Sequence, residues 1–182
     1  MDVKNYFLKM RGGKNCPPRA PWHEIFWSTL GAFLGILAIY VIGHLHDLKL
    51  EDSLFLVGSF GATAVLVYAI PLSPFAQPRN LVGGHLLSAI VGVSCALFLP
   101  DNTAIAAASA VALAVLVMHI SRTLHPPGGA TALIAVMGSE HIHVLGYWYV
   151  LSPIGLGVLI MLIIAVVMNN LSQHRRYPQY WC

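Results

Sequence analysis

Histidine, threonine and arginine residues that lie close to glycine or proline are the part of this sequence best suited to chemistry. The candidate binding residues are His125, Pro126, Pro127, Gly128, Gly129, Thr131, Gly61, Thr63, Arg79, Asn80 and His85. A helix that begins inside a membrane leaves its first backbone N–H groups without helical partners, and its partial positive charge attracts an anion. We therefore expect these residues to bind a small anion, and we identify no catalytic residue.

The tetrapeptide Gly-Ala-Thr-Ala occurs twice, beginning at Gly61 and at Gly129. Each copy lies in the middle segment of one half of the chain, so we expect two helix starts that approach the middle of a membrane from opposite sides. The hydroxyl groups of Thr63 and Thr131 would add two donors. The alternative is that the glycines only permit close packing and that both threonines bond to their own helices.

The run from His125 to Gly129 is unsuited to regular helix, because two prolines lack backbone donors and two glycines add backbone freedom. We expect a helix to restart at about Gly129. Irregular backbone at membrane depth is tolerated only where protein or a water-filled cavity pairs its polar groups. The loop is therefore expected to line a cavity.

The charged and titratable candidates each have two interpretations. His125 can donate to an anion or carry a coupled proton, or it can simply cap the proline turn. His85 lies in an apolar segment, where a polar ring is expected to face the bundle interior. Arg79 and Asn80 suit an anion at the inner mouth of a pathway. For Arg79 and Arg122 the alternative is an anchor on lipid phosphate.

Metal and catalytic sites find little support. The pairs His44 with His46 and His141 with His143 are interpreted as solvated loop residues rather than as a metal site. No Asp or Glu lies within the apolar segments, and the GxSxG and HExxH patterns do not occur, so we predict neither a cofactor nor an enzyme. A pathway without carboxylates suits an anion or a neutral polar molecule rather than a cation.

Composition places these residues in a membrane protein. Of the 182 residues, 57% are hydrophobic and 9% are charged, against about a quarter charged in an ordinary globular domain. Most of the six apolar segments approach the roughly 20 residues that cross a bilayer as a helix. The segments cover residues 25–42, 53–70, 81–99, 103–120, 128–137 and 148–168.

We therefore expect an all-α membrane protein, a six-span helical bundle of two inverted three-segment repeats in which the second and fifth segments are broken. The transmembrane domain is expected over residues 22–170, with the repeats at about 25–99 and 103–168. Residues 1–21 form a basic cytoplasmic tail, and residues 171–182 form a cytoplasmic C-terminal tail.

The distribution of charge agrees with six crossings. With a cytoplasmic N-terminus, nine of the ten Lys and Arg residues lie on the inner side, and Lys49 is the exception. Five of the seven acids lie outside, namely Asp47, Glu51, Asp52, Asp101 and Glu140. We expect a plasma (inner) membrane location, contact with lipid and no nucleic-acid partner. The pair Gly31 and Gly35 is a packing signal, and such faces would also suit a homo-oligomer.

Two stretches carry a family resemblance. Residues 124–133 (Leu-His-Pro-Pro-Gly-Gly-Ala-Thr-Ala-Leu) and residues 73–85 (Ser-Pro-Phe-Ala-Gln-Pro-Arg-Asn-Leu-Val-Gly-Gly-His) resemble the HPP family of small integral membrane proteins. The family is usually described with four spans, and its chloroplast and cyanobacterial members are associated with nitrite transport. The resemblance thus implies transport, with nitrite as a candidate. Six segments agree with four spans if the two Gly-Ala-Thr-Ala segments are broken or re-entrant.

The expected function is a membrane transporter or channel for a small inorganic anion, with nitrite as the candidate and a midplane site at the helix N-termini. A channel for a neutral polar solute such as water, ammonia or a weak acid is the first alternative. A non-transporting membrane scaffold or sensor is the second.

Overall fold

The described part of the chain is helical throughout. The computed structural model describes residues 2–10, 16–45 and 58–182, and within them every regular element is a helix. The elements are α1 (Val3–Lys9), α2 (Trp22–Leu45), the helix Gly58–Ala69 with its π-helical end η1 (Val65–Ala69), η2 (Pro74–Ala76), α4 (Pro78–Phe98), α5 (Thr103–Ile120), α6 (Pro127–Met137), α7 (Glu140–Leu145), η3 (Val150–Gly155) and α8 (Leu156–Leu171). Outside the described residues lie His46, Asp47, Lys49, Glu51, Asp52 and the first positions, 53–57, of the second apolar segment.

The apolar helices of the described residues fall into two length classes. Four of them are long and apolar enough to cross a bilayer, namely Trp22–Val41, Pro78–Phe98, Thr103–Ile120 and Val150–Leu171. The helices Gly58–Ala69 and Pro127–Met137 are apolar but shorter. The 11 residues of α6 cover roughly 16 Å, about half of a 30 Å bilayer core. The expected all-α fold is confirmed, and the two segments expected to be broken are the two short helices.

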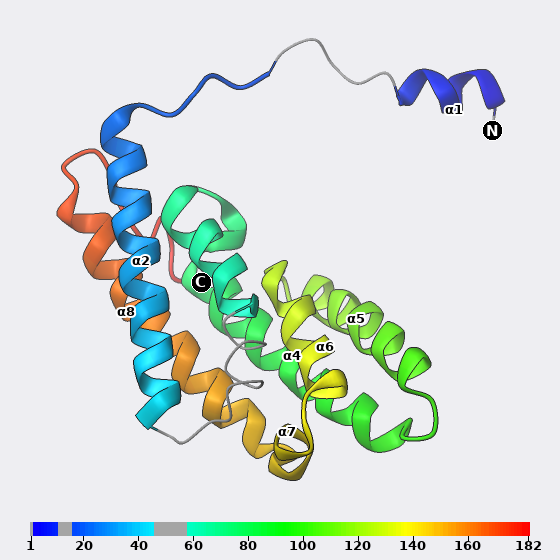
Figure 1. Ribbon diagram of the computed structural model, residues 1–182. Coiled ribbons are helices and arrows are strands. Elements are labelled where there is room, and N and C mark those ends of the chain that lie inside the picture. The colour runs from blue at the N-terminus through cyan, green and yellow to red at the C-terminus, as the bar shows by residue number, and fades with distance from the viewer. Residues whose placement is uncertain (1, 11–15, 46–57) are drawn as a thin grey trace.

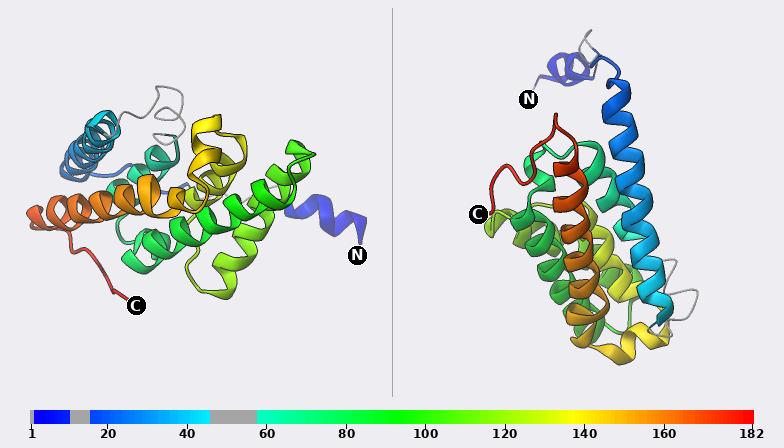
Figure 2. Two further views of the ribbon diagram at one scale, coloured as in Figure 1. Left: turned by 90° about the horizontal axis from the view of Figure 1, so that it is seen from below. Right: turned by 90° about the vertical axis from the view of Figure 1, so that its left-hand side faces the viewer.

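Helix α4 lies at the centre of the bundle, where it contacts α5, α6, η3 and α8 (Figure 1). On one side of it, α2 packs against η1 and α8, and Figure 2 shows α2 and α8 running side by side. On the other side, α5 packs against α6 as well as α4. Helices from both halves of the chain therefore meet around α4.

Glycine allows α2 to pack closely on its neighbour. Cβ atoms added at Gly31 and Gly35 would lie 2.8 and 2.6 Å from atoms of the Tyr68 side chain. No larger residue fits there unless the buried ring moves. The pair predicted as a packing signal therefore packs on Tyr68, whose hydroxyl donates to the carbonyl oxygen of Met161 on α8 (3.3 Å).

The end of α5 turns the chain back onto α4. Arg122 has a φ of 57°, in the left-handed region that glycine usually occupies at helix ends. Its N–H donates to the carbonyl oxygen of His119 (3.2 Å), and the N–H of Thr123 donates to that of Met118 (2.9 Å). These two bonds form a Schellman motif, which closes α5 and reverses the chain just before His125.

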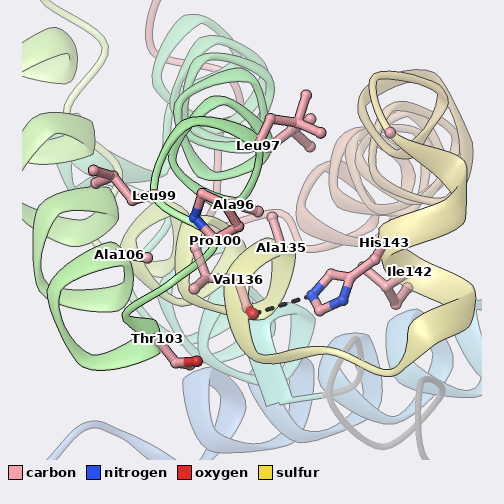
Figure 3. Close-up of a pocket in the computed structure, with 12 residues that line it drawn as sticks. Ala96, Leu97, Leu99, Pro100, Thr103, Ala106, Ala135, Val136, Ile142 and His143 are labelled. Carbon is pink, nitrogen blue, oxygen red and sulfur yellow. Dashed lines mark hydrogen bonds between the residues drawn. The ribbon is translucent and has the colours of Figure 1, made fainter.

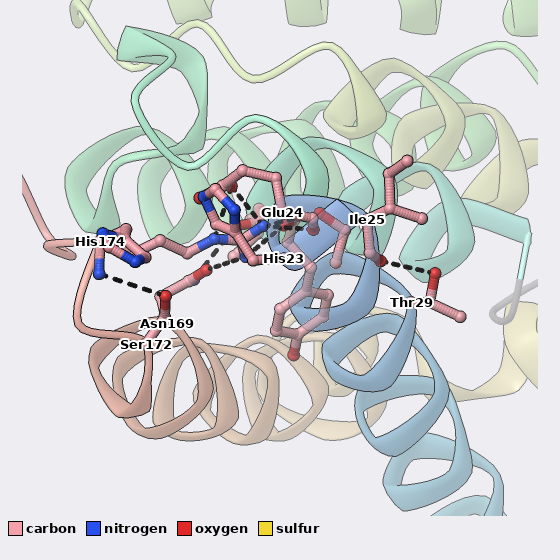
Figure 4. Close-up of polar contacts among 11 residues, drawn as sticks. His23, Glu24, Ile25, Thr29, Asn169, Ser172 and His174 are labelled. Atoms are coloured by element: carbon pink, nitrogen blue, oxygen red, sulfur yellow. Dashed lines mark hydrogen bonds and ion pairs between the residues drawn. The ribbon is translucent and has the colours of Figure 1, made fainter. Parts of the chain in front are cut away.

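Polar contacts that include Glu24 and Asn169 join three helix ends (Figure 4). Arg175 bonds to both of these side chains. Its side chain is only 3% exposed, and Nη2 lies 2.6 Å from Glu24 Oε2 on α2. Nη1 donates to the carbonyl oxygen of Tyr68 (3.0 Å) and to Asn169 Oδ1 (3.0 Å). A buried charge is tolerated when it is paired and hydrogen-bonded in this way. The start of α2, the end of η1 and the end of α8 therefore lie together.

The C-terminal tail packs against the start of α4 at the same end of the bundle. The hydroxyl of Tyr177 donates to the carbonyl oxygen of Ala76 (2.7 Å), and burial raises its pKa. Arg79 at the start of α4 donates to the carbonyl oxygen of Ser121 at the end of α5 (3.0 Å). Arg79 and Arg175 thus lie at one end of the bundle, as the charge pattern predicts for one membrane face.

Candidate functional site

Five hydrogen-bonding side chains meet inside the bundle, where α4, α6, the helix Gly58–Ala69 and the loop before α6 come together. We call them the polar chain; they are Ser59, Thr63, His85, His125 and Thr131, and each is at most 1% exposed. Polar groups in the apolar interior of a membrane bundle are costly unless they bond to one another. Here each member bonds to at least one other member.

His85 on α4 is the centre of the polar chain. Its Nε2 lies 2.8 Å from Thr63 Oγ1, and its Nδ1 lies 2.7 Å from Thr131 Oγ1. The two threonines belong to the two Gly-Ala-Thr-Ala copies. The structure therefore brings both copies to one imidazole ring, which accounts for a histidine in the middle of an apolar helix.

His125 forms one end of the polar chain. Its Nε2 lies 3.2 Å from Thr63 Oγ1, and its Nδ1 lies 2.7 Å from the carbonyl oxygen of Phe75. The ring centroids of His125 and His85 are 4.9 Å apart. Gly84 permits this approach, because a Cβ there would lie 2.4 Å from the Cβ of His125. The first histidine of the His-Pro-Pro motif thus lies inside the protein, beside the repeat.

Ser59 forms the other end, and it is not among the candidates named from the sequence. Its Oγ lies 2.8 Å from Thr131 Oγ1 and 3.2 Å from the carbonyl oxygen of Pro127. The usable signal was its spacing of four residues from Thr63, which puts both hydroxyls on one helix face. Tyr149 is also absent from the sequence-based candidates: it is fully buried and donates to the carbonyl oxygen of Thr131 (3.0 Å).

The expectation of unpaired amides at the start of α6 is wrong for the two glycines. The N–H of Gly128 donates to the carbonyl oxygen of His125 (2.8 Å), and that of Gly129 donates to the carbonyl oxygen of Pro126 (3.1 Å). Pro126 already has helical angles (φ −50°, ψ −38°), so α6 begins at Pro127 instead of about Gly129. Prolines fit the first turn of a helix because it needs no internal donors there. The first turn therefore pairs its own amides.

The expectation of a helix start at Gly61 is also wrong, because this helix is already formed at Gly58. No proline precedes this copy to interrupt it, and a Cβ added at Gly61 meets no atom of the described residues within 4 Å. Gly128 has a packing role instead. A Cβ there would lie 2.7 Å from Ser88 Oγ, a buried atom for which the described residues provide no hydrogen-bond partner.

Arg79 and Asn80 do not reach the polar chain; they brace the loop that carries His125. The side-chain amide of Asn80 donates to the carbonyl oxygen of Leu124 (2.8 Å), next to His125. Arg79 is exposed and holds the end of α5 through Ser121. Their observed contacts are structural, and a role at a pathway mouth stays a prediction.

A cavity of about 240 Å³ lies at the opposite end of the bundle from the arginines (Figure 3). Its lining includes Val93, Thr103 and Ile142, together with His143, whose Nε2 lies 3.1 Å from the carbonyl oxygen of Val136. Neither the polar chain nor the loop before α6 contributes to this lining. Elsewhere, the described residues contain no group of three His, Cys, Asp or Glu side chains placed to hold a metal ion.

Comparisons with known proteins place the chain in a family. The family model described as the HPP transmembrane region matches residues 17–178. Two Dictyostelium discoideum proteins, each named only as a transmembrane protein, are 45% identical to this chain over 179 and 186 residues. These alignments cover 97% and 100% of this chain, but 57% and 65% of the relatives, so the chain spans about three fifths of their length. No solved structure matches. The chain belongs to the HPP transmembrane-region family of integral membrane proteins.

Proposed function

We propose that this protein transports a small inorganic anion of a weak acid, with nitrite as the first candidate. We further propose that the substrate binds to the side chains of the polar chain during transport. The observation that carries the proposal is His85 held between Thr63 and Thr131, one threonine from each repeat copy. Five buried polar side chains in an apolar bundle are costly to retain, and such residues in membrane proteins mark solute and proton pathways. The resemblance to a family whose chloroplast and cyanobacterial members are associated with nitrite transport supports the same proposal.

The chemistry of the polar chain favours an anion over a cation. Its members supply hydroxyl and imidazole groups, and none carries a negative charge. An anion entering between the threonines would accept the hydrogen bonds that the side chains now exchange with one another. Bonds would be replaced rather than lost, so the buried donors stay satisfied. A cation would find no carboxylate to balance its charge.

The packing observed here is a closed state of the proposed pathway, because the amides of Gly128 and Gly129 and the five side chains bond within the protein. We propose that the short helices Gly58–Ala69 and α6 move apart from α4 to admit the substrate. Both short helices are bonded to α4 through His85, which contacts Thr63 on one and Thr131 on the other. The long helices are the ones that span the membrane in this proposal. The anion is then bound by side chains instead of by the helix-start amides first expected.

We further propose that the chain makes six crossings as two inverted halves. In support, α2 packs on η1 and α8, while α5 packs on α6 and α4, so each half repeats the same pattern of neighbours. Transporters built from inverted repeats bind substrate where the halves meet. The arginine-rich end of the bundle supports cytoplasmic termini. Location in the plasma membrane and assembly as a homo-oligomer stay predictions.

Flux in liposomes tests this function. The purified full chain is reconstituted, and uptake is measured for a panel of nitrite, nitrate, formate and chloride, with protein-free vesicles subtracted because undissociated acid crosses lipid. We expect saturable nitrite uptake that falls at least tenfold in His85→Gln and in His125→Ala. Thr29→Val, which alters an exposed hydroxyl bonded only within α2, is the matched control.

The other outcomes separate the alternatives. Osmotic or ammonia permeability without anion uptake would replace the proposal by a neutral-solute channel. Reconstituted, folded protein that raises no flux for any solute would favour a scaffold or sensor. Uptake that is unchanged in both histidine variants would remove the polar chain from the pathway.

A further inference from the structure

The direction of every hydrogen bond in the polar chain is set at one end. His125 Nδ1 lies 2.7 Å from the carbonyl oxygen of Phe75, and a carbonyl oxygen only accepts. Nδ1 of His125 therefore carries the hydrogen. If the ring is neutral, Nε2 is an acceptor, and the hydroxyl 3.2 Å away on Thr63 is the group that donates to it.

The remaining steps follow in order. Thr63 has a single hydroxyl hydrogen, so the contact of 2.8 Å between its oxygen and His85 Nε2 requires that His85 donates. A neutral His85 with hydrogen on Nε2 accepts at Nδ1, and the donor there is Thr131 (2.7 Å). Thr131 in turn accepts from Ser59 (2.8 Å). All five side chains then donate in one direction, from Ser59 to His125.

We propose that the polar chain is a proton path that links Ser59 to His125, so that movement of the anion is coupled to movement of a proton. This inference rests on the proposed transport function for its role. The connectivity stands apart from it, because it follows from the distances and the donor inventory when both rings are neutral and the hydroxyls of Thr63 and Ser59 donate within the polar chain rather than to the carbonyl oxygens of Ser59 and Pro127.

Transfer of one proton along the polar chain reverses the direction of every hydrogen bond between its members. A proton given to Ser59 Oγ by the undissociated acid leaves the anion behind, and the Ser59 hydrogen passes to Thr131. The Thr131 hydrogen passes to Nδ1 of His85, the ring releases its Nε2 hydrogen to Thr63, and Thr63 gives its own to Nε2 of His125. His125 becomes an imidazolium ion and every other member stays neutral. Each contact remains a hydrogen bond with donor and acceptor exchanged.

The charge on His125 in that state has no fixed partner in the described residues. The carboxylates there belong to Asp2, Glu24, Asp101 and Glu140, which lie in the N-terminal tail, at helix ends and in a connecting turn. On the described elements packed around the polar chain and the turns that connect them, the other titratable or charged groups are Tyr68, Arg79, Cys95, Asp101, His119, Arg122, Glu140, His141, His143, Tyr147 and Tyr149. Of these, Tyr149 bonds to the polar chain through the carbonyl oxygen of Thr131. In this proposal the substrate anion supplies the counter-charge of the imidazolium, which couples the two movements.

Thr63 is the connecting point between the two rings. Its hydroxyl lies 3.2 Å from the carbonyl oxygen of Ser59, the same distance as from His125 Nε2. Rotation of this hydroxyl toward Ser59 separates His125 from His85 without moving any backbone. A valine at position 63 removes the connection permanently while both histidines remain.

Two variants at Thr63 test the path by flux. Nitrite uptake and internal pH are recorded together in liposomes, with and without a pH gradient that is acidic outside. We expect the gradient to raise wild-type uptake several-fold over protein-free vesicles, with matching internal acidification. Thr63→Ser should keep this response and Thr63→Val should lose it, while Thr29→Val behaves as wild type. Gradient-driven uptake that persists in Thr63→Val would overturn the path, as would wild-type nitrite uptake without gradient dependence.

Nitrogen-15 NMR of histidine-labelled protein tests the path without transport. At a pH where both rings are neutral, we expect hydrogen on Nδ1 of His125 and on Nε2 of His85, each assigned from the spectra of His125→Gln and His85→Gln. If the protein transports no solute but both rings show the expected tautomers, the proposed transport function is wrong and the proton path is still supported. The opposite tautomer on either ring would overturn the path whatever the flux.

Discussion

Nδ1 of His85 lies 2.7 Å from the hydroxyl oxygen of Thr131, and this bond joins the central helix α4 to the short helix α6. Both side chains are fully buried, so neither is in contact with bulk water. The bond therefore contributes to stability as well as to any pathway, and the two roles can be separated by experiment.

Replacing Thr131 by valine is expected to destabilise the protein. The change keeps side-chain shape but leaves Nδ1 of His85 without its partner and removes one of the two partners of the Ser59 hydroxyl, a loss of about 1–3 kcal/mol for buried polar groups. Thr131→Ser should recover most of the loss. Thermal unfolding in detergent, followed by circular dichroism, measures both. A Thr131→Val midpoint equal to that of Thr29→Val would show that this bond contributes nothing.

Ser88 offers a prediction in the opposite direction. Its hydroxyl is buried on α4 without a hydrogen-bond partner in the described residues. Ser88→Ala should therefore raise stability by about 1 kcal/mol, because an unpaired buried hydroxyl is costly. Ser94→Ala is the control on the same helix, since Ser94 bonds to Ile90 and Tyr147 and gains nothing from truncation. A lowered midpoint for Ser88→Ala would indicate that a partner such as water occupies this position.

Two glycines of the repeat region are expected to respond differently to alanine. At Gly128 a Cβ would lie 2.8 Å from the carbonyl oxygen of Gly84, so Gly128→Ala should cost about 1–3 kcal/mol through overpacking. Gly61 lies inside a helix, and no atom of the described residues lies within 4 Å of a Cβ added there, so Gly61→Ala should be neutral or stabilise by up to about 1 kcal/mol. The unfolding midpoints of Gly128→Ala and Gly61→Ala, each compared with the unsubstituted protein, test whether the first glycine is tightly packed and the second is not. Equal losses would mean that Gly61 is packed as tightly as Gly128.

Parts of the fold and the site were accessible from the sequence because they depend on local patterns. Hydrophobic runs predicted an all-α membrane protein, and the repeated Gly-Ala-Thr-Ala marked the two threonines that meet at His85. Ser59 was missed because a single serine in an apolar helix has no local feature that predicts a distant partner. Glu24 and Arg175 are 151 residues apart, and no helical or strand period relates them.

The errors at the two helix starts have a conformational cause. The expectation treats proline as a helix breaker, so that the glycine amides would be unpaired. Because Pro126 adopts helical angles, the carbonyl oxygens of His125 and Pro126 are positioned to accept from those amides. Whether a proline interrupts a helix or begins one depends on the residues around it, here the turn at Arg122 that reverses the chain.

The turn at Arg122 gives a test of how this loop is held. A non-glycine residue with φ of 57° costs about 1 kcal/mol relative to glycine. Arg122→Gly should therefore stabilise the protein by a similar amount, whereas Arg122→Ala should give no such gain. Because the side chain is exposed, loss of its charge costs little by itself. Unfolding midpoints of the two variants decide the point, and equal midpoints would contradict the left-handed conformation.

The strongest destabilisation is expected from Arg175, where one side chain holds three helix ends. Arg175→Ala leaves the carboxylate of Glu24 and the carbonyl oxygen of Tyr68 without their donor, and breaking such a pair costs about 3 kcal/mol. The neighbouring Arg176 is exposed, so Arg176→Ala should change stability by less than about 0.5 kcal/mol. Both variants lose one positive charge, which removes net charge and topology as explanations of a difference. Chemical unfolding in detergent measures the two losses. Equal values would mean that the buried ion pair is not formed in the folded protein, and α2 would then need another attachment to α8.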